Sequence, residues 1–162
     1  MFAKVVLILG GNLGDRQELI NRAVKSISEK NRLILNSALY ETQAWGDVAQ
    51  GNFLNQVIQI ETSLSPEKLL EQIQQIEEKL GRKRTVIWGD RTMDIDILYY
   101  GDEVIDTPEL TIPHRLIQER RFVLVPLFEI LPDMIHPLLY KSNRALLEDC
   151  QDSSEVNIFI GK

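Results

Sequence analysis

The chain has 162 residues, 44% of them hydrophobic and 26% charged, with only 9 Gly and 6 Pro. This composition is typical of a globular protein and excludes a fibrous or disordered chain, and the length suits a single domain, 1–162. The net charge of −6 disfavours general nucleic-acid binding, which needs a broad positive field. No apolar run approaches the roughly 20 residues of a membrane span, and the single cysteine, Cys150, excludes an internal disulfide. We expect a cytoplasmic protein.

The patterns in the first hundred residues alternate between strand and helix. In chain order they predict a strand at 4–9, a helix after Asp15, strands at 33–42 and 53–62, a helix from Ser65 to Gly81, and a strand at 94–100. Both helices begin with a suitable N-cap residue, and apolar residues recur at helical spacing after it. The βαββαβ order predicts an α+β, ferredoxin-like fold, a mainly antiparallel sheet with two helices packed on one face.

The pattern is weaker beyond residue 100. Gly101 and Asp102 predict a hairpin turn that pairs residues 103–105 with the preceding strand. Several later prolines break the chain into short pieces, so we expect only short helices, near 116–121 and 144–149. The alternation of apolar residues after residue 150 is compatible with a strand, but the sequence does not decide whether this tail packs as one.

Two aspartates lie two residues apart at the start of the predicted strand at 94–100. Because alternate side chains of a strand point to the same face, the carboxylates of Asp94 and Asp96 converge, while Ile95 points to the core. Like charges held this close repel each other unless a cation lies between them, and oxygen ligands suit Mg²⁺. The pair alone also fits a solvated strand face, so the neighbouring residues decide between the two.

A basic cluster leads directly to this carboxylate pair. Arg82, Lys83 and Arg84 follow the second helix, and Arg91 lies three residues before Asp94. Arginine binds phosphate oxygens in a bidentate manner, and with Mg²⁺ it neutralises charge that shifts during phosphoryl transfer. The cluster meets what a polyphosphate needs, but basic residues also stabilise a helix C-terminus, and the cluster alone fits both roles equally.

A second basic segment surrounds a histidine. His114 lies close in sequence to Arg115 and Arg120, so it is a candidate phosphate ligand, whereas His136 lies among apolar residues and is expected to be structural. The sequence has no Gly-x-x-x-x-Gly-Lys-Ser/Thr loop and no Gly-x-Gly-x-x-Gly motif. If the protein uses ATP, its triphosphate is therefore held by magnesium and arginine side chains.

Three motifs occur in order along most of the chain. Residues 10–13 read Gly-Gly-Asn-Leu, residues 88–96 read Trp-Gly-Asp-Arg-Thr-Met-Asp-Ile-Asp, and residues 112–114 read Ile-Pro-His, with Arg120 and Phe122 downstream. They are similar to the Gly-Ser-Asn-Leu, Trp-Gly-Pro-Arg-Thr-Leu-Asp-Leu-Asp and Val-Pro-His motifs of the 6-hydroxymethyl-7,8-dihydropterin pyrophosphokinase family. The chain departs from the family pattern at Gly11, Gln43, Asp90 and Arg115.

The resemblance implies transfer of pyrophosphate from ATP to the hydroxymethyl group of the reduced pterin, giving AMP and the pterin diphosphate, in folate biosynthesis. It implies that Asp94 and Asp96 bind two Mg²⁺ ions and that, with Arg82 and Arg91, they form the catalytic set. The implied nucleotide-binding residues are Glu77, Arg82, Arg84, Trp88, Arg91, His114 and Arg120. The implied pterin-binding residues are Thr42, Gln43, Trp45, Phe53, Asn55 and Phe122.

Two other classes of protein fit parts of the sequence. A ferredoxin-like module that only binds a small molecule would be indifferent to Mg²⁺, and the carboxylate pair disfavours it. A metal-dependent nucleic-acid enzyme also uses an Asp-x-Asp pair, but the acidic charge and the lack of a long basic stretch disfavour it. We therefore expect an Mg²⁺-dependent pyrophosphokinase that is a monomer and binds neither nucleic acid nor membranes. We expect Asp94, Asp96 or a water to receive the hydroxyl proton.

Overall fold

The computed structural model describes residues 1–43, 52–81 and 92–161, and its centre is a six-stranded sheet. The strands of this sheet are β1 (Ala3–Gly11), β2 (Arg32–Asn36), β3 (Tyr40–Thr42), β4 (Phe53–Thr62), β5 (Asp94–Tyr100) and β8 (Val156–Ile158). Their order is β5-β1-β4-β3-β8, and β2 also pairs with β4. Each of these pairings is antiparallel. β1 and β4 therefore lie in the middle of the sheet.

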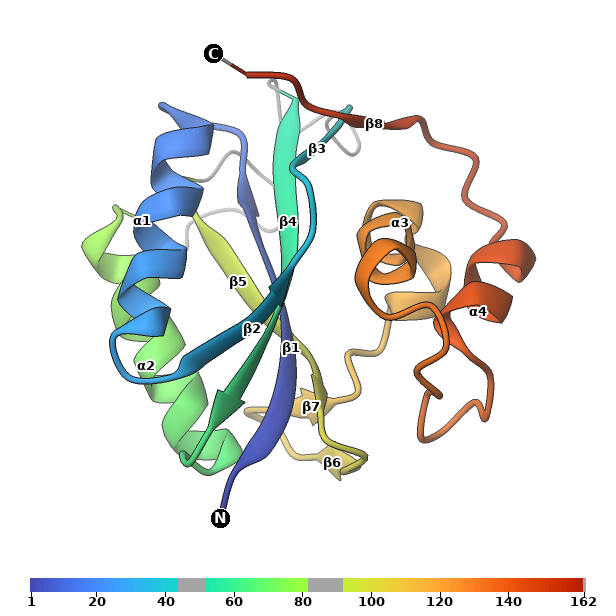
Figure 1. Ribbon diagram of the computed structural model, residues 1–162, viewed down its shortest axis with the longest axis horizontal. Helices are drawn as coiled ribbons and strands as arrows, with labels where there is room; N and C mark the ends of the chain where they lie inside the picture. The colour runs from blue at the N-terminus through green and yellow to red at the C-terminus, as the bar shows by residue number, and fades with distance from the viewer. Residues whose placement is uncertain (44–51, 82–91, 162) are drawn as a thin grey trace.

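Helices cover both faces of this sheet (Figure 1). α1 (Arg16–Ser28) and α2 (Pro66–Lys79) lie side by side on one face, and α3 (Arg121–Ile130) and α4 (Asn143–Asp149) lie on the other. The order β1-α1-β2-β3-β4-α2-β5 confirms the predicted ferredoxin-like α+β fold, with its two long helices on one face. α3 and α4 add a third layer.

β1 is buried on both faces because it runs through the centre of the sheet. Val5, Leu7 and Leu9 pack in the core cluster shared with α1 and α2. Val6 and Ile8 point the other way and pack in a second cluster, shared with α3 and α4. This alternation follows from the two-residue period of a strand, and it assigns the even-numbered residues of β1 to the α3 face.

Both long helices begin where the sequence predicts, and α2 also ends there. The carboxylate of Asp15 accepts a hydrogen bond from the Glu18 N–H at 3.2 Å, and the Ser65 hydroxyl accepts one from the Lys68 N–H at 3.2 Å. Such caps satisfy N–H groups that have no partner within the helix. Gly81, at a φ of 90°, follows α2 and has the backbone conformation that ends many helices.

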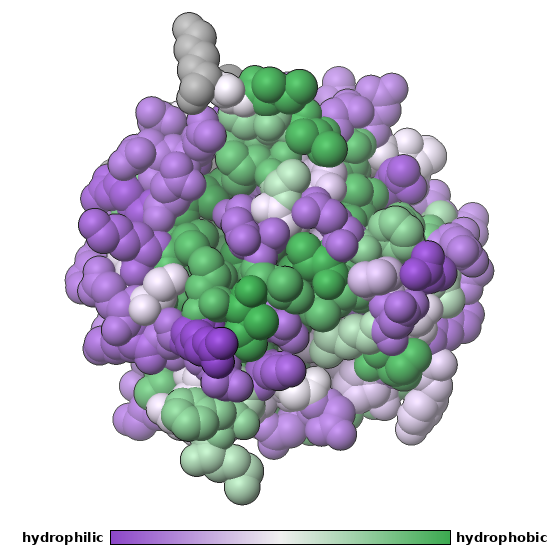
Figure 2. Space-filling view, in the orientation of Figure 1, coloured by the Kyte–Doolittle hydropathy of each residue, from purple (hydrophilic) through white to green (hydrophobic). Residues whose placement is uncertain are grey.

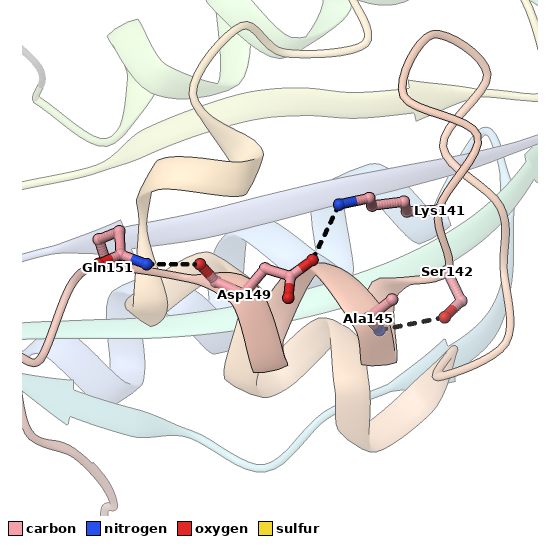
Figure 3. Close-up of polar contacts among 5 residues, drawn as sticks. All are labelled: Lys141, Ser142, Ala145, Asp149 and Gln151. Atoms are coloured by element: carbon pink, nitrogen blue, oxygen red, sulfur yellow. Dashed lines mark hydrogen bonds and ion pairs between the residues drawn. The ribbon is translucent and has the colours of Figure 1, made fainter.

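α4 confirms the short helix predicted near 144–149, and polar contacts hold both of its ends (Figure 3). The Ser142 hydroxyl accepts a hydrogen bond from the Ala145 N–H at 3.1 Å. At the other end, the Lys141 ammonium lies 2.9 Å from the Asp149 carboxylate, and the Gln151 amide donates to the Asp149 carbonyl oxygen at 3.1 Å. These contacts fix the point from which the C-terminal tail leaves.

The prediction of one strand at 33–42 is wrong, because β2 and β3 are separate strands. Between them, the Ala38 N–H donates to both carboxylate oxygens of Glu129 on α3, at 3.1 and 3.2 Å, instead of extending the ladder with β4. The pairing of β2 with β4 is also irregular, with a register shift between Leu33 and Leu35. A contact with a helix that is distant in sequence thus interrupts the strand.

The prediction that residues 103–105 pair with β5 in a hairpin is also wrong. Residues Ile105–Asp106 (β6) pair with Thr111–Ile112 (β7) in a separate two-stranded sheet, and not with β5. Gly101 adopts a φ of 54° and donates its N–H to the Lys4 carbonyl oxygen at 2.7 Å. The turn at Gly101 therefore ties the chain to β1 and directs it away from β5.

α3 is longer than the sequence predicts. The helix expected near 116–121 is a single 3-10 turn at Ile117–Glu119, and α3 then continues through Pro126. A proline inside a helix costs about 3 kcal/mol. Burying one large apolar side chain contributes about 1.5–3 kcal/mol, and Val123, Leu124 and Leu127 are all buried. Packing against the sheet therefore outweighs the lost hydrogen bond.

The tail after Cys150, which the sequence leaves undecided, forms β8 on the outer edge of β3, across the top of Figure 1. Figure 2, in the same orientation, shows hydrophilic residues over the outer side of α1 and apolar residues gathered nearer the middle. Among the residues that the structure describes, no helix is both long enough and apolar enough to cross a membrane.

Candidate functional site

A pocket opens on the α3 face of the sheet, where β3, β4, β1 and β5 lie next to one another. Its empty space, open mouth included, is about 660 Å³. Strands, the residue after β3 and the start of α3 supply the lining: Ile8, Gly10, Thr42, Gln43, Phe53, Asn55, Asp94, Asp96, Arg120 and Phe122. The pocket thus brings together residues predicted for the pterin, the metal and the phosphates.

The register of the sheet explains why these residues meet. Gly10 on β1 lies opposite Asn55 on β4 and opposite Asp94 on β5. Ile8, two residues earlier on β1, lies opposite Asp96. Residues that are paired across antiparallel strands point to the same face, and neighbouring strands lie about 4.8 Å apart. Asn55 and Asp94 therefore share one face, about 10 Å apart across β1.

Gly10 leaves room for the side chain of Asn55. A Cβ atom at Gly10 would lie 1.9 Å from Asn55 Oδ1 and 2.5 Å from the Leu54 carbonyl oxygen, so no larger residue fits without movement. The Asn55 amide therefore lies directly over the backbone of β1. It is 7% exposed and lies at the wall of the pocket.

The carboxylate pair lies at the start of β5. Asp94 and Asp96 line the pocket while Ile95 is buried on the opposite face, as the alternation predicts. The described residues contain no group of three or more His, Cys, Asp or Glu side chains that would hold a metal. Two carboxylates beside an open pocket fit a hard cation such as Mg²⁺, which takes its remaining ligands from water and substrate phosphates.

Glu77 on α2 supports this part of β5 from behind. Its side chain is 2% exposed, and Glu77 Oε2 accepts a hydrogen bond from the Ile95 N–H at 2.8 Å. Ile95 lies between the two aspartates, so the contact fixes the backbone that carries them. Glu77 is outside the pocket lining, and its described contact is with the strand.

His114 lies beside the site on the segment between β7 and α3. The backbone N–H of His114 donates to the Leu98 carbonyl oxygen at 3.0 Å, and the ring Nδ1 accepts from the Leu116 N–H at 3.1 Å. Burial, and then the positive charge of Arg120, lower the pKa of His114 to about 4, against the opposing effect of Asp94. At neutral pH the ring is therefore uncharged, with its proton on Nε2.

Arg120 and Phe122 enter the pocket from the start of α3. The Arg120 guanidinium carbon lies 5.5 Å from the centre of the Phe122 ring, a cation–π contact that orients both groups. Phe53, on β4, supplies a second aromatic side chain to the same pocket. The pocket therefore combines two aromatic rings and a cationic group with the carboxylate pair of Asp94 and Asp96.

The structure brings together eight of the predicted site residues in the pocket: Thr42, Gln43, Phe53, Asn55, Asp94, Asp96, Arg120 and Phe122. Glu77 lies behind it and accepts the hydrogen bond of the Ile95 N–H, and His114 lies beside it, with its backbone N–H bonded to the Leu98 carbonyl oxygen. The predictions for Trp45, Arg82, Arg84, Trp88 and Arg91 fall outside the described residues. Sequence reasoning missed Ile8, whose even position on β1 places it in the pocket only once the sheet order is known.

The fold and the pocket define a ferredoxin-like α+β protein with an aromatic-lined pocket beside a pair of carboxylates. A family model described as 7,8-dihydro-6-hydroxymethylpterin-pyrophosphokinase (HPPK) matches residues 6–132. A 2-amino-4-hydroxy-6-hydroxymethyldihydropteridine pyrophosphokinase of Aquifex aeolicus is 46% identical over 139 residues, 86% of this chain and 87% of the relative. The protein of the same name from Haemophilus influenzae is 44% identical, over 81% of this chain and 83% of the relative. The chain belongs to this pyrophosphokinase family.

Solved structures agree on the fold. The crystal structure of Plasmodium falciparum HPPK-DHPS with pteroate matches with a TM-score of 0.75 at 19% identity. The match covers 91% of this chain but 42% of that protein, so this chain spans less than half of it. At this identity the similarity shows the fold alone.

We predict that Gly10→Ala destabilises the protein through its contact with Asn55. Overpacking of this kind costs about 1–3 kcal/mol, to be measured as a lower free energy of unfolding in urea. The double variant Gly10→Ala/Asn55→Ala should recover part of the loss, because the 1.9 Å contact is gone. Asn55→Ala alone is the control. A Gly10→Ala variant as stable as the parent would contradict the close approach.

We also predict that His114 stays neutral in the metal-free protein until the pH falls to about 4. Its pKa lies below the ordinary value near 6.5, so the unfolded chain binds this proton first. The contribution of His114 to stability is complete above pH 6.5 and is lost as the pH falls from 6.5 toward 4.

Imidazole resonances in NMR spectra measure this directly, since the chain has 2 His, and the loss of one signal in His114→Asn assigns them. A His114 ring that titrates near pH 6.5, or that carries its neutral proton on Nδ1, would contradict the described environment.

Proposed function

We propose that the chain transfers the β,γ-pyrophosphoryl group of ATP to the hydroxymethyl group of 6-hydroxymethyl-7,8-dihydropterin, giving AMP and the pterin diphosphate, in folate biosynthesis. Membership of the pyrophosphokinase family supports the reaction. The observation that carries the proposal is that Asn55 and Asp94 flank the same residue of β1 on one face. A ring held by the first and phosphates held by the second then meet over Gly10.

The pterin would occupy the end of the pocket formed by β3 and β4. Thr42 and Asn55 are almost fully buried there, 6% and 7% exposed, and a buried hydroxyl and amide can pair with the polar edge of a pterin. Phe53 and Phe122 line the same pocket, and aromatic side chains pack well on flat rings. Gln43 and Trp45 complete the proposed pterin set.

The carboxylates of Asp94 and Asp96 would hold Mg²⁺, and we propose two ions. Hard oxygen donors next to each other suit this cation, and the chain offers them beside an open cavity. Bound Mg²⁺ would polarise phosphate oxygens and offset their negative charge. Glu77, through its hydrogen bond to the Ile95 N–H, would keep the two carboxylates aligned, in addition to its proposed place near the nucleotide.

Basic side chains would hold the phosphates. Arg120 lines the pocket, and the neutral His114 ring has its Nε2–H available as a donor. Arg82 and Arg91, with Arg84 and Trp88, are proposed for the triphosphate from the resemblance to the family. Guanidinium groups bind phosphate oxygens in pairs, which would align the β-phosphorus with the alcohol.

In the proposed reaction the hydroxymethyl oxygen attacks the β-phosphorus, and the bond between that phosphorus and the oxygen that bridges to the α-phosphorus breaks. AMP leaves with the bridging oxygen. The hydroxyl proton passes to Asp94, to Asp96 or to a water. Alignment by Asn55 and the arginines supplies much of the rate enhancement, because positioning replaces an encounter in solution. We further propose that residues 1–162 act as one domain, as a cytoplasmic monomer.

We predict that AMP release from ATP requires both the pterin and Mg²⁺, as measured with each omitted or with EDTA. Asp96→Asn should lower kcat/KM by roughly 100-fold or more, the usual effect of removing a charge that stabilises a transition state. Its unfolding should change little, because the side chain is partly exposed at the pocket.

Asp102→Asn is the matched control, since Asp102 is exposed at the other end of β5. ADP as the product would show a simple kinase, and full activity of Asp96→Asn would contradict the proposed metal site.

A further inference from the structure

The wall of the pocket on the β3 side rests on a very short strand. β3 has only three residues, Tyr40–Thr42, and Thr42 and the following Gln43 line the pocket. β3 pairs with β4 over only three residues. This pairing holds β3 weakly, because each backbone hydrogen bond contributes only about 0.5–1.5 kcal/mol. Contacts outside the ladder must therefore fix where Thr42 lies.

On the α3 face, Tyr40 makes such a contact, two residues before Thr42. The Tyr40 hydroxyl donates to the Glu129 carboxylate at 2.6 Å. Tyr40 itself is 6% exposed, and burial with the nearby Glu129 raises its pKa, which keeps the hydroxyl protonated as a donor. This side of β3 is thus fixed to α3.

On the opposite face, Arg16 joins β3 to β4. Arg16 is the first residue of α1, and one guanidinium nitrogen, Nη1, donates to Glu41 Oε2 at 2.6 Å and to the Asn52 carbonyl oxygen at 3.0 Å. Glu41 precedes Thr42, and Asn52 precedes Phe53. One side chain therefore connects the backbone next to two residues of the pocket lining.

The C-terminal tail covers this arginine. The Phe159 ring centre lies 5.3 Å from the Arg16 guanidinium carbon, a cation–π contact. The Phe159 N–H donates to the Leu39 carbonyl oxygen at 2.8 Å, and β8 pairs residue by residue with β3, with Thr42 opposite Val156. Phe159 lies beyond residues 6–132, the part matched by the family model.

We propose that Arg16 is a positioning residue for the pterin site, and that Phe159 of the C-terminal tail holds Arg16 in place. This inference rests on the proposed function, because the pterin is the ligand whose binding it affects. The Arg16 guanidinium fixes the spacing between the end of β3 and the start of β4, and hence between Thr42 and Phe53. It touches neither substrate.

The effect is expected on pterin binding more than on stability. The Arg16 and Glu41 side chains are 23% and 33% exposed, and partly exposed ion pairs contribute little to the free energy of unfolding. Binding is more sensitive, because a site must hold its groups within a fraction of an ångström. Asp94 and Asp96 lie across β1 and β4 from this contact, so ATP binding should not change.

The test is steady-state kinetics of Arg16→Ala with the pterin and ATP varied in turn. We expect the KM for the pterin to rise at least about fivefold, with kcat and the KM for ATP within about twofold of the parent. Phe159→Ala should raise the same KM by a smaller factor. The double variant should be no worse than Arg16→Ala, because Phe159 acts through Arg16.

Arg32→Ala is the matched control. Arg32 also forms an ion pair across the sheet, 3.9 Å from Glu61 at the other end of β4, and its loss should leave both KM values unchanged. An unchanged pterin KM in Arg16→Ala, or an equal rise in both KM values with reduced thermal stability, would overturn the inference. A parent protein that releases no pterin-dependent AMP would instead overturn the proposed function.

Discussion

The site depends on the antiparallel pairing of β1 with β4 on one side and β5 on the other. This pairing sets Gly10 between Asn55 and Asp94, and the strand spacing then fixes their separation at about 10 Å. The missing side chain of Gly10 is part of the same constraint, because the Asn55 amide occupies its space. A shift of β5 by one residue would turn the aspartates to the opposite face.

The helices on the two faces of the sheet contribute to the site in different ways. α1 and α2 bury the odd-numbered residues of β1. Glu77 of α2 also accepts a hydrogen bond from the Ile95 N–H of β5. α3 packs on the other side and brings Arg120 and Phe122 to the pocket. An acidic protein, with a net charge of −6, can then hold an anionic ligand, since positive charge is placed locally where phosphates would lie.

The sequence alone predicts those features of the structure that depend on residues close together in the chain. The two-residue period placed Asp94 and Asp96 on one face, and N-cap residues predicted the starts of α1 and α2. Features that depend on distant contacts could not be predicted. The break between β2 and β3 needs Glu129, the continuation of α3 through Pro126 needs the sheet beneath it, and Ile8 joins the pocket only through the strand order. The roles expected for Trp45, Arg82 and Arg91 remain predictions.

The most direct test of the central claim is to locate the metal by paramagnetic broadening. Mn²⁺ takes the same oxygen ligands as Mg²⁺, and it can be added with a non-hydrolysable ATP analogue while amide resonances are recorded. The account predicts that the amide signals of Gly10, Asp94 and Asp96 broaden first, while that of Tyr100, about 13–20 Å along β5 from the two aspartates, broadens less. Broadening centred on the acidic residues 148–152 instead would contradict it.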